Sequence, residues 1–249
     1  MNKVAQVTLY FWIIKICATT LGETAGDLLS MTMNVGYGLS SAILIGFFLI
    51  AVIAQLKSSK FNAVLYWTVI LATSTAGTTM SDFMDRTLEL GYAKGSLILS
   101  TCLLVVLAVW HFSEKTISVS NIQTTKVELF YWVAILFSNT LGTALGDFLA
   151  DDSGLGFLGG AALIAGLIGV VVLATYLTKV NRVLLFWIAF VLTRPFGATF
   201  GDLLTKPIEK GGLDFGTGGS SLILASLLVI FIVYSSTVDK RLANRQKNI

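Results

Sequence analysis

Residues 12–27 read WIIKICATTLGETAGD, an apolar run in which a tryptophan is followed ten residues later by a glycine and fifteen residues later by an aspartate. The tryptophans of four such runs are 55, 65 and 55 residues apart, which indicates an internal repeat. An ionisable group in a long apolar segment is costly, so four aspartates at one repeated position suggest a shared polar site. The four copies are Trp12/Gly22/Asp27, Trp67/Gly77/Asp82, Trp132/Gly142/Asp147 and Trp187/Gly197/Asp202.

The composition is that of a membrane protein. Of the 249 residues, 55% are hydrophobic and 12% are charged, and the mean hydropathy is +0.82. Soluble domains carry about 25% charged residues. We therefore expect an all-α integral membrane protein, with residues 1–249 as a single membrane domain. The bilayer is its expected environment, a nucleic-acid partner is not expected, and homo-oligomerisation is left open.

Eight segments are long enough to cross a bilayer, which takes about 20 apolar residues each. Each odd segment carries the Trp-Gly-Asp frame, and each even segment is plain and begins with small residues. We expect four parallel two-helix repeats, because a two-helix unit returns the chain to its starting side. The segments are 7–30, 38–56, 62–84, 94–112, 128–150, 157–177, 183–204 and 218–236, and the repeats are about 4–58, 59–113, 124–179 and 180–238.

Lysines and arginines predict the orientation, because they are enriched in cytoplasmic loops. Eleven lie on the side of the N-terminus and four on the other side, which predicts that both termini are cytoplasmic. The tryptophans then serve as anchors at the cytoplasmic interface, and the aspartates, about 22 Å further along each helix, lie in the outer half of the membrane. The eleven are Lys3, Lys57, Lys60, Lys115, Lys126, Lys179, Arg182, Lys240, Arg241, Arg245 and Lys247; the four are Arg86, Lys94, Lys206 and Lys210.

Small residues four apart lie on one helix face and let another helix approach closely. Polar residues three positions before each first glycine lie on nearly the same face, so we expect the odd helices to pack through it. The small pairs are Gly22/Gly26, Gly77/Ser81, Gly142/Gly146 and Gly197/Gly201.

The carboxylates beside this face are candidate metal ligands: Glu23, Asp27, Asp82, Asp147 and Asp202. The candidates for substrate binding or charge tuning are Lys15, Thr19, Ser74, Asn139 and Arg194. We expect Lys15 to snorkel toward the cytoplasmic interface and Arg194 to pair with an acid on a neighbouring helix. Pro195 beside it resembles a broken-helix binding site. Asp85, Glu89, Asp151, Asp152, Glu209 and Asp214 are interpreted as solvated loop acids.

Carboxylates, hydroxyls and one amide are hard oxygen donors that suit Mn²⁺, Mg²⁺ or Ca²⁺ and suit Zn²⁺ poorly. A cluster of carboxylates can also exchange protons for a cation. The sequence shows no nucleophile–base pair, phosphate-binding loop or redox motif. An enzyme is therefore not expected, nor is a tightly bound cofactor; a divalent cation is the expected substrate.

The fourfold frame, with YFWIIK at residues 10–15 and TTLGE at 19–23, resembles a functionally uncharacterised family of small bacterial inner-membrane proteins. The resemblance implies a multi-pass protein of the bacterial inner (plasma) membrane and carries no activity with it. A looser likeness, used only as chemical analogy, is to small cation/proton exchangers with Glu-x-Gly-Asp motifs on repeated helices.

The leading hypothesis is a secondary transporter, an antiporter that exports a divalent cation, with Mn²⁺ favoured, in exchange for protons. The first alternative is a non-transporting membrane scaffold or sensor. The second is a transporter of a small organic substrate that binds through Arg194. Glu23 and Arg194 break the fourfold equivalence, so the site is expected between repeats one and four.

Overall fold

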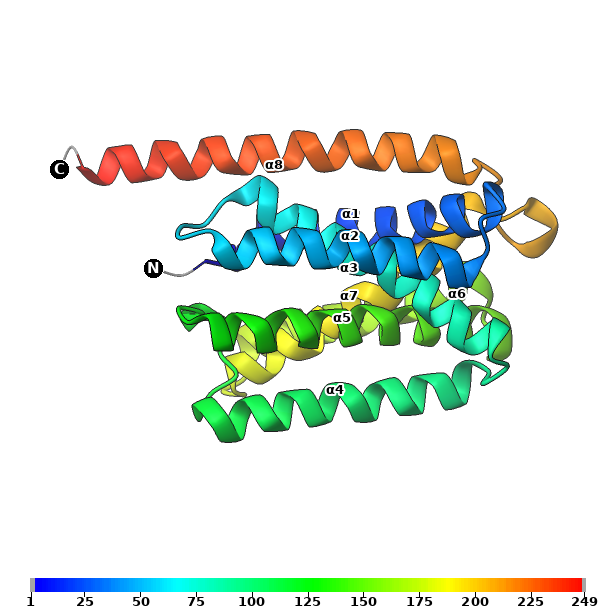
Figure 1. Cartoon of the computed structure of the whole chain (residues 1–249), viewed down its shortest axis with the longest axis horizontal. Helices are drawn as coiled ribbons and strands as arrows, with labels where there is room; N and C mark the ends of the chain where they lie inside the picture. The colour runs from blue at the N-terminus through cyan, green and yellow to red at the C-terminus, as the bar shows by residue number, and fades with distance from the viewer. Residues whose placement is uncertain (1–2, 248–249) are drawn as a thin grey trace.

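The described part of the chain folds into eight long helices, as the spacing of the apolar segments predicts. The structure is a computed structural model that describes residues 3–247, and the side chains of residues 3–120 and 122–238. The helices lie lengthwise beside one another, and the start of α1 and the end of α8 lie at the same end of the bundle (Figure 1). Their bounds are α1 Leu9–Asp27, α2 Tyr37–Lys57, α3 Ala63–Asp82, α4 Tyr92–Glu114, α5 Thr125–Asp147, α6 Gly156–Leu177, α7 Arg182–Thr205 and α8 Thr217–Lys247.

The odd helices form a closed ring of four. Helix α1 packs on α3 and α7, and α5 packs on the same two neighbours. The even helices lie outside the ring, where α2 packs on α3, α4 on α5, α6 on α7 and α8 on α1. Each even helix therefore makes its main contact with the odd helix of the next repeat, and the repeats interlock rather than stand as separate hairpins.

Among the described residues, six helices are long and apolar enough to cross a membrane: α2, α4, α5 with the turn after it, α6, α7 and α8 as far as Val238. The described outer surface is rich in large apolar side chains, such as Ile50 on α2, Leu104 on α4 and Tyr176 on α6. Helices α1 and α3 carry more polar residues, and these face the interior of the ring. The arrangement is compatible with a multi-pass membrane protein whose polar groups are inside.

The turn after each of the first three aspartates is a π-helical turn. It spans Leu28–Thr32, Phe83–Thr87 and Phe148–Asp152, and each closes with a bond from a backbone N–H to the carbonyl five residues earlier, as from Leu88 to Phe83. In repeat four α7 stops at Thr205, and a short 3₁₀ turn at Ile208–Lys210 follows. The chain therefore follows a different path after Asp202 than it does after the aspartates of the other three repeats.

The backbone that leads into each even helix has the same conformation in all four repeats. Two residues with positive φ stand two positions apart, a conformation that Gly or Asn adopts most readily. Each even helix begins at the second of them or directly after it. The pairs are Asn34/Gly36, Glu89/Gly91, Gly154/Gly156 and Asp214/Gly216. The first member of the pair stands seven positions after the aspartate in repeats one to three and twelve positions after it in repeat four.

The repeated tryptophans do not act as interface anchors. Trp67, Trp132 and Trp187 are at most 4% exposed, and Trp12 is half-buried. They point into the ring and pack on other aromatic side chains; Trp132, for example, lies 5.5 Å from Tyr66 between ring centroids. That prediction is wrong because large aromatic and apolar side chains fill the interior of the ring at this level.

The end of the bundle near the start of α1 is closed by polar contacts between distant segments. Lys3 Nζ lies 3.0 Å from Glu128 Oε2, and Gln55 Nε2 donates to Glu128 Oε1 and to the Lys3 carbonyl. One layer inward, the hydroxyls of Tyr66 and Tyr131 are 2.6 Å apart. This closure leaves the opposite end, where the aspartates lie, as the more accessible one.

Several helix boundaries differ from the predicted spans, most of all that of α8. Helix α8 continues to Lys247, well past residue 236, because the polar stretch that follows retains helical propensity. The side chains of Lys240, Arg241, Arg245 and Lys247 lie outside the described residues. Helix α4 extends to Glu114, and the linker to α5 contains a 3₁₀ turn at Val119–Asn121.

Candidate cation site

The ring is held together by its glycines. A Cβ at Gly77 would lie 2.9 Å from the backbone nitrogen of Thr140, and a Cβ at Gly197 would lie 2.6 Å from Thr19 Oγ1. The prediction that the odd helices pack through this face is confirmed. The first glycine of each repeat meets the residue three before the first glycine of the next: Gly22 meets Ser74, Gly77 meets Asn139, Gly142 meets Arg194 and Gly197 meets Thr19.

The second small residue repeats this contact one turn further along. Gly26 lies against Thr78, and Gly201 lies against Glu23. Because the backbones approach so closely, the side chains that follow the first glycines are forced into the interior of the ring. Glu23 and Thr78 therefore meet at its centre, where Thr78 Oγ1 lies 3.2 Å from Glu23 Oε2.

Lys15 is the first of the polar groups along the interior. Its Nζ donates to Asn139 Oδ1 at 3.2 Å and lies 4.1 Å from the centroid of the Phe190 ring. Asn139 Nδ2 in turn donates to Thr73 Oγ1. The side chain is fully buried, so the expectation that it snorkels is wrong. It extends across the ring from α1 to α5 rather than along the helix, and no carboxylate of the described residues lies within 4 Å.

Arg194 pairs with Glu23, which confirms that it meets an acid on a neighbouring helix. Its Nη1 lies 2.9 Å from Glu23 Oε2, and Nη2 donates to Thr78 Oγ1 at 2.5 Å and to the Ser74 carbonyl. The guanidinium thus joins α7 to α1 and α3. Pro195 does not break α7, which is one helix from Arg182 to Thr205, so the broken-helix interpretation is wrong.

The four aspartates form the next layer, and two basic residues join them in pairs. Arg86 Nε lies 2.8 Å from Asp82 Oδ1, and its Nη2 lies 3.5 Å from Asp147 Oδ2. Lys206 Nζ lies 2.6 Å from Asp27 Oδ2 and 3.1 Å from Asp202 Oδ1. Each basic residue follows the aspartate of its own repeat by four positions and reaches the aspartate of the next repeat. The layer therefore has twofold rather than fourfold symmetry.

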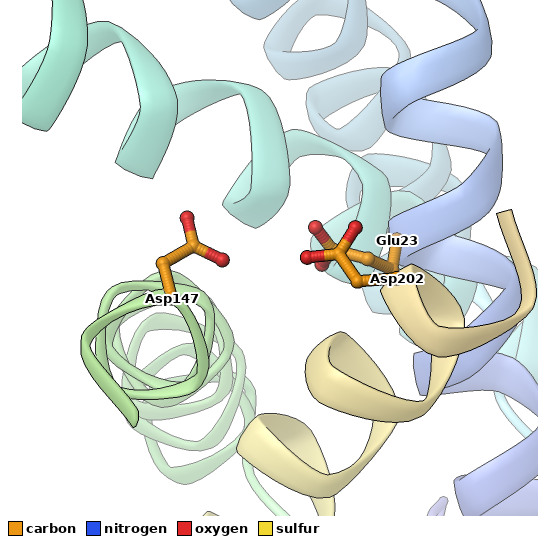
Figure 2. Close-up of side chains that lie close together, drawn as sticks. All are labelled: Glu23, Asp147 and Asp202. Carbon is orange, nitrogen blue, oxygen red and sulfur yellow. The ribbon is translucent and has the colours of Figure 1, made fainter. Parts of the chain in front are cut away.

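Three carboxylates converge at the centre of this layer. Glu23 on α1, Asp147 on α5 and Asp202 on α7 each offer an oxygen within 4.8 Å of the other two, and all three are buried. Figure 2 shows Glu23 and Asp202 close together, with Asp147 facing them. We call this group the carboxylate triad. The structure does not gather all five predicted ligands into one group: Asp27 and Asp82 lie outside the triad, and each shares a basic residue, Lys206 or Arg86, with a triad member.

The donor set fits a hard divalent cation. Carboxylate oxygens are the ligands that Mn²⁺, Mg²⁺ and Ca²⁺ prefer. The hydroxyl of Thr143, which occupies the position of Glu23 in repeat three, is buried with no hydrogen-bond partner among the described residues. If all are ionised, five interior carboxylates face four interior cations, so the described interior is short of positive charge. The carboxylates are Glu23, Asp27, Asp82, Asp147 and Asp202; the cations are Lys15, Arg86, Arg194 and Lys206.

The predicted tuning residues lie on the aromatic side of the triad rather than in it. Thr19 Oγ1 donates to the carbonyl of Ile16 or of Thr193, and the Ser74 hydroxyl is buried without a partner among the described residues. Asn139 is occupied by Lys15 and Thr73. The backbone carbonyls of Thr19 and Ser74 accept hydrogen bonds from the Arg194 guanidinium and help to hold it in place.

Arg86 and Lys206 are functional candidates that sequence reasoning assigned only to a loop. The available signal was their spacing, because each stands one helical turn after an aspartate of the repeated frame. The interpretation of Asp85 as a solvated acid is wrong. Its side chain is 5% exposed, because it accepts a bond from Ser81 Oγ and lies against Gly95 at the start of α4.

A family model described as a repeat of unknown function matches the chain four times, over residues 10–61, 65–116, 130–181 and 185–240. These matches cover most of the chain and correspond to the four repeats of the structure. No curated protein and no solved structure matches the chain.

Proposed function

We propose that this chain, which belongs to the family of the DUF347 repeat, is an integral membrane antiporter. It moves a divalent cation, with Mn²⁺ first among the candidates, in exchange for protons. The observation that carries the proposal is the carboxylate triad. Three buried acids from three different helices converge within 4.8 Å in the interior of a largely apolar bundle.

Such a triad requires positive charge. Carboxylates buried together repel one another and lose their hydration, so each needs a proton, a metal ion or a basic side chain beside it. Arg194 contacts Glu23, Arg86 contacts Asp147 and Lys206 contacts Asp202, yet the five interior acids still outnumber the four interior bases. The remaining negative charge is available to a cation or to protons.

Proton exchange follows because protons and the cation bind to the same carboxylate oxygens. A carboxylate that binds a metal ion must be deprotonated, so binding of the cation releases protons and protonation releases the cation. Competition of this kind is sufficient for coupled exchange if the site opens to one side of the membrane at a time. The polar and aromatic closure around Glu128, Tyr66 and Tyr131 supplies a barrier at one end.

The distribution of Lys and Arg supports an orientation with both termini in the cytoplasm. Glu23, Asp147 and Asp202 then lie in the outer half of the membrane, and export of the cation toward the near outer face is the favoured direction. The likeness to small bacterial membrane proteins supports the bacterial inner membrane as the location. Chemistry on a covalent substrate is not part of the proposal.

A second candidate function is a non-transporting membrane scaffold or sensor. The observation that favours it is the double pairing of the aspartates, since Arg86 and Lys206 each bridge two of them. In that case the polar groups specify how the ring assembles and move nothing. Arg194 gives less support to an organic substrate, because both of its terminal nitrogens are bound within the protein.

Flux measurements decide between the two. We would reconstitute the protein in liposomes and follow Mn²⁺ movement driven by a proton gradient, together with the reverse movement of protons. Asp147→Asn removes a member of the carboxylate triad and is expected to abolish both fluxes. Asp152→Asn, which changes an exposed acid five residues later, is the matched control and is expected to leave them unchanged. Absence of Mn²⁺, Mg²⁺ and Ca²⁺ flux in the unaltered protein would reject the antiporter and favour the scaffold.

A further inference from the structure

The carboxylate triad already has a cation of the protein's own beside it, the ammonium group of Lys206. We propose that Lys206 is a tethered counter-ion, which is shared by Asp27 and Asp202 before the transported cation binds and is displaced from Asp202 when it does. The inference rests on the proposed function, because it concerns how that same site is filled and emptied.

The contacts of Lys206 place it in competition with a metal ion. Its Nζ lies 3.1 Å from Asp202 Oδ1, and Asp202 belongs to the triad. The second contact, 2.6 Å to Asp27 Oδ2, lies outside the triad and stays available after Asp202 is released. A cation held by Glu23, Asp147 and Asp202 and an ammonium on Asp202 repel one another at this range, so the two states exclude each other.

The backbone at Lys206 differs from that in the other repeats. There the chain continues into a π-helical turn after the aspartate, whereas here α7 ends and Lys206 is extended, with φ −73° and ψ 153°. Pro207 follows, and the additional residues of repeat four form a loop that contains Gly211 at φ +85° and returns to bond Leu203 and Lys206. Lys206 therefore follows the last residue of α7, so its side chain can withdraw without unwinding the helix.

Accessibility also distinguishes Lys206. Its side chain is 18% exposed, whereas Asp27 and Asp202 beside it are 3% and 5% exposed. It therefore covers the acids on the side that opens away from the aromatic end of the ring. A lysine ammonium is a compact point charge on a flexible stem and resembles a monatomic cation more closely than a planar guanidinium does.

Arg86, the equivalent residue of repeat two, is also partly exposed, but it lacks the extended backbone and the compact charge of Lys206. It lies within the helical turn Phe83–Thr87, its guanidinium is 5.6 Å from the centroid of the Tyr92 ring, and it contacts three acids at once. We assign Arg86 a fixed structural role. The ring thus has one fixed pair of aspartates, joined by Arg86, and one pair whose counter-ion can leave.

The exchange limits the charge that the interior must carry. If a divalent cation enters while the ammonium leaves Asp202, the positive charge in contact with the triad at Asp202 changes by one rather than two. When the cation departs, the return of Lys206 prevents Asp202 from remaining as a bare buried carboxylate, which is the costly state. Lys206 is therefore a positioning residue that lowers the affinity for the cation and favours its release.

Amine labelling tests the displacement directly on the unaltered protein. We would treat the purified protein in detergent with an amine-acylating reagent, with and without saturating Mn²⁺, and quantify acylation of Lys206 and Lys210 by peptide mass spectrometry. Labelling of Lys206 is expected to rise several-fold with Mn²⁺. Lys210 lies in the same loop, is exposed and serves as the internal control. Unchanged or reduced labelling of Lys206 under conditions where Mn²⁺ stabilises the protein would overturn the proposal.

A binding comparison gives an independent test. Lys206→Met is expected to tighten Mn²⁺ binding about tenfold or more, as removal of a competing cation should, and Lys210→Met is expected to leave it unchanged. If the unaltered protein binds Mn²⁺ and Lys206→Met binds no tighter, the tethered counter-ion is rejected and the cation site stands. If neither binds Mn²⁺, both proposals fall. Should Lys206→Met not fold, the labelling result alone decides.

Discussion

Glu23 on α1 and Arg194 on α7 form an ion pair with 2.9 Å between Oε2 and Nη1, and their side chains are only 4% and 0% exposed. Neither residue has a charged counterpart at its position in the other repeats. The pair breaks the fourfold equivalence of the ring at the contact between repeats four and one. It also holds Glu23 beside Asp202, on which the carboxylate triad depends.

The ion pair predicts an asymmetric response to mutation. Arg194→Met leaves Glu23 buried without its partner and is expected to cost about 3–5 kcal/mol of stability. Glu23→Gln added to it removes the stranded charge, so the double variant is expected to regain much of that loss. Thermal unfolding in detergent measures both. Equal losses in the single and the double variant would show that the pair is not coupled.

Lys15 is expected to behave differently from Arg194, although both are fully buried cations. It has no carboxylate within 4 Å among the described residues, and the equivalent positions of repeats two and three hold Ile70 and Ile135. Lys15→Met therefore removes a buried charge and leaves none unpaired, and its loss is expected to stay within about 1 kcal/mol, the worth of the hydrogen bond to Asn139. Unfolding measured beside Arg194→Met checks this. A loss as large as that of Arg194→Met would show that the Lys15 ammonium stabilises an acid of the ring.

The glycine contacts predict that a Gly→Ala substitution changes stability in opposite directions at two positions. A Cβ at Gly77 would lie 2.9 Å from the Thr140 nitrogen and 3.0 Å from the Asn139 carbonyl carbon, and backbone atoms cannot move aside cheaply. Gly77→Ala is expected to destabilise the protein by about 1–3 kcal/mol.

Gly46 on α2 is the matched control, because a Cβ there meets nothing within 4 Å. Gly46→Ala is expected to be neutral or to stabilise by up to about 1 kcal/mol through helix propensity. Thermal unfolding of the two variants decides. If Gly77→Ala did not lower the stability, the close approach of α3 and α5 would be contradicted.

Cation binding predicts a stability change that depends on the triad. At a concentration of about 100 times its dissociation constant, Mn²⁺ is expected to stabilise the folded protein by about 2.7 kcal/mol, and a chelator should reverse the shift. Asp147→Asn is expected to abolish the shift, whereas Asp152→Asn retains it. A titration of melting temperature against Mn²⁺, Mg²⁺ and Ca²⁺ provides the measurement. A shift that survives Asp147→Asn would place the binding site elsewhere.

Much of the secondary structure and of the packing face could be predicted from local pattern. Apolar runs of about 20 residues, the small residues at positions such as Gly22 and Gly26, and the repeat itself are properties of neighbouring positions along the chain. The predictions that were wrong concerned the direction in which a side chain points. Lys15 and the tryptophans have the composition of interface residues, and only the packed ring shows that they point inward.

The sequence by itself determined eight helices in four repeats, with acids at the same end of every odd helix, because helix length, periodicity and repeat spacing are encoded locally. Tertiary structure decided which acids meet. Glu23, Asp147 and Asp202 come together, while Asp27 and Asp82 are held by Lys206 and Arg86. That choice depends on the cyclic order of the odd helices and on basic side chains that reach across a helix contact. Neither is a property of residues close together in the chain, so only the closed ring specifies it.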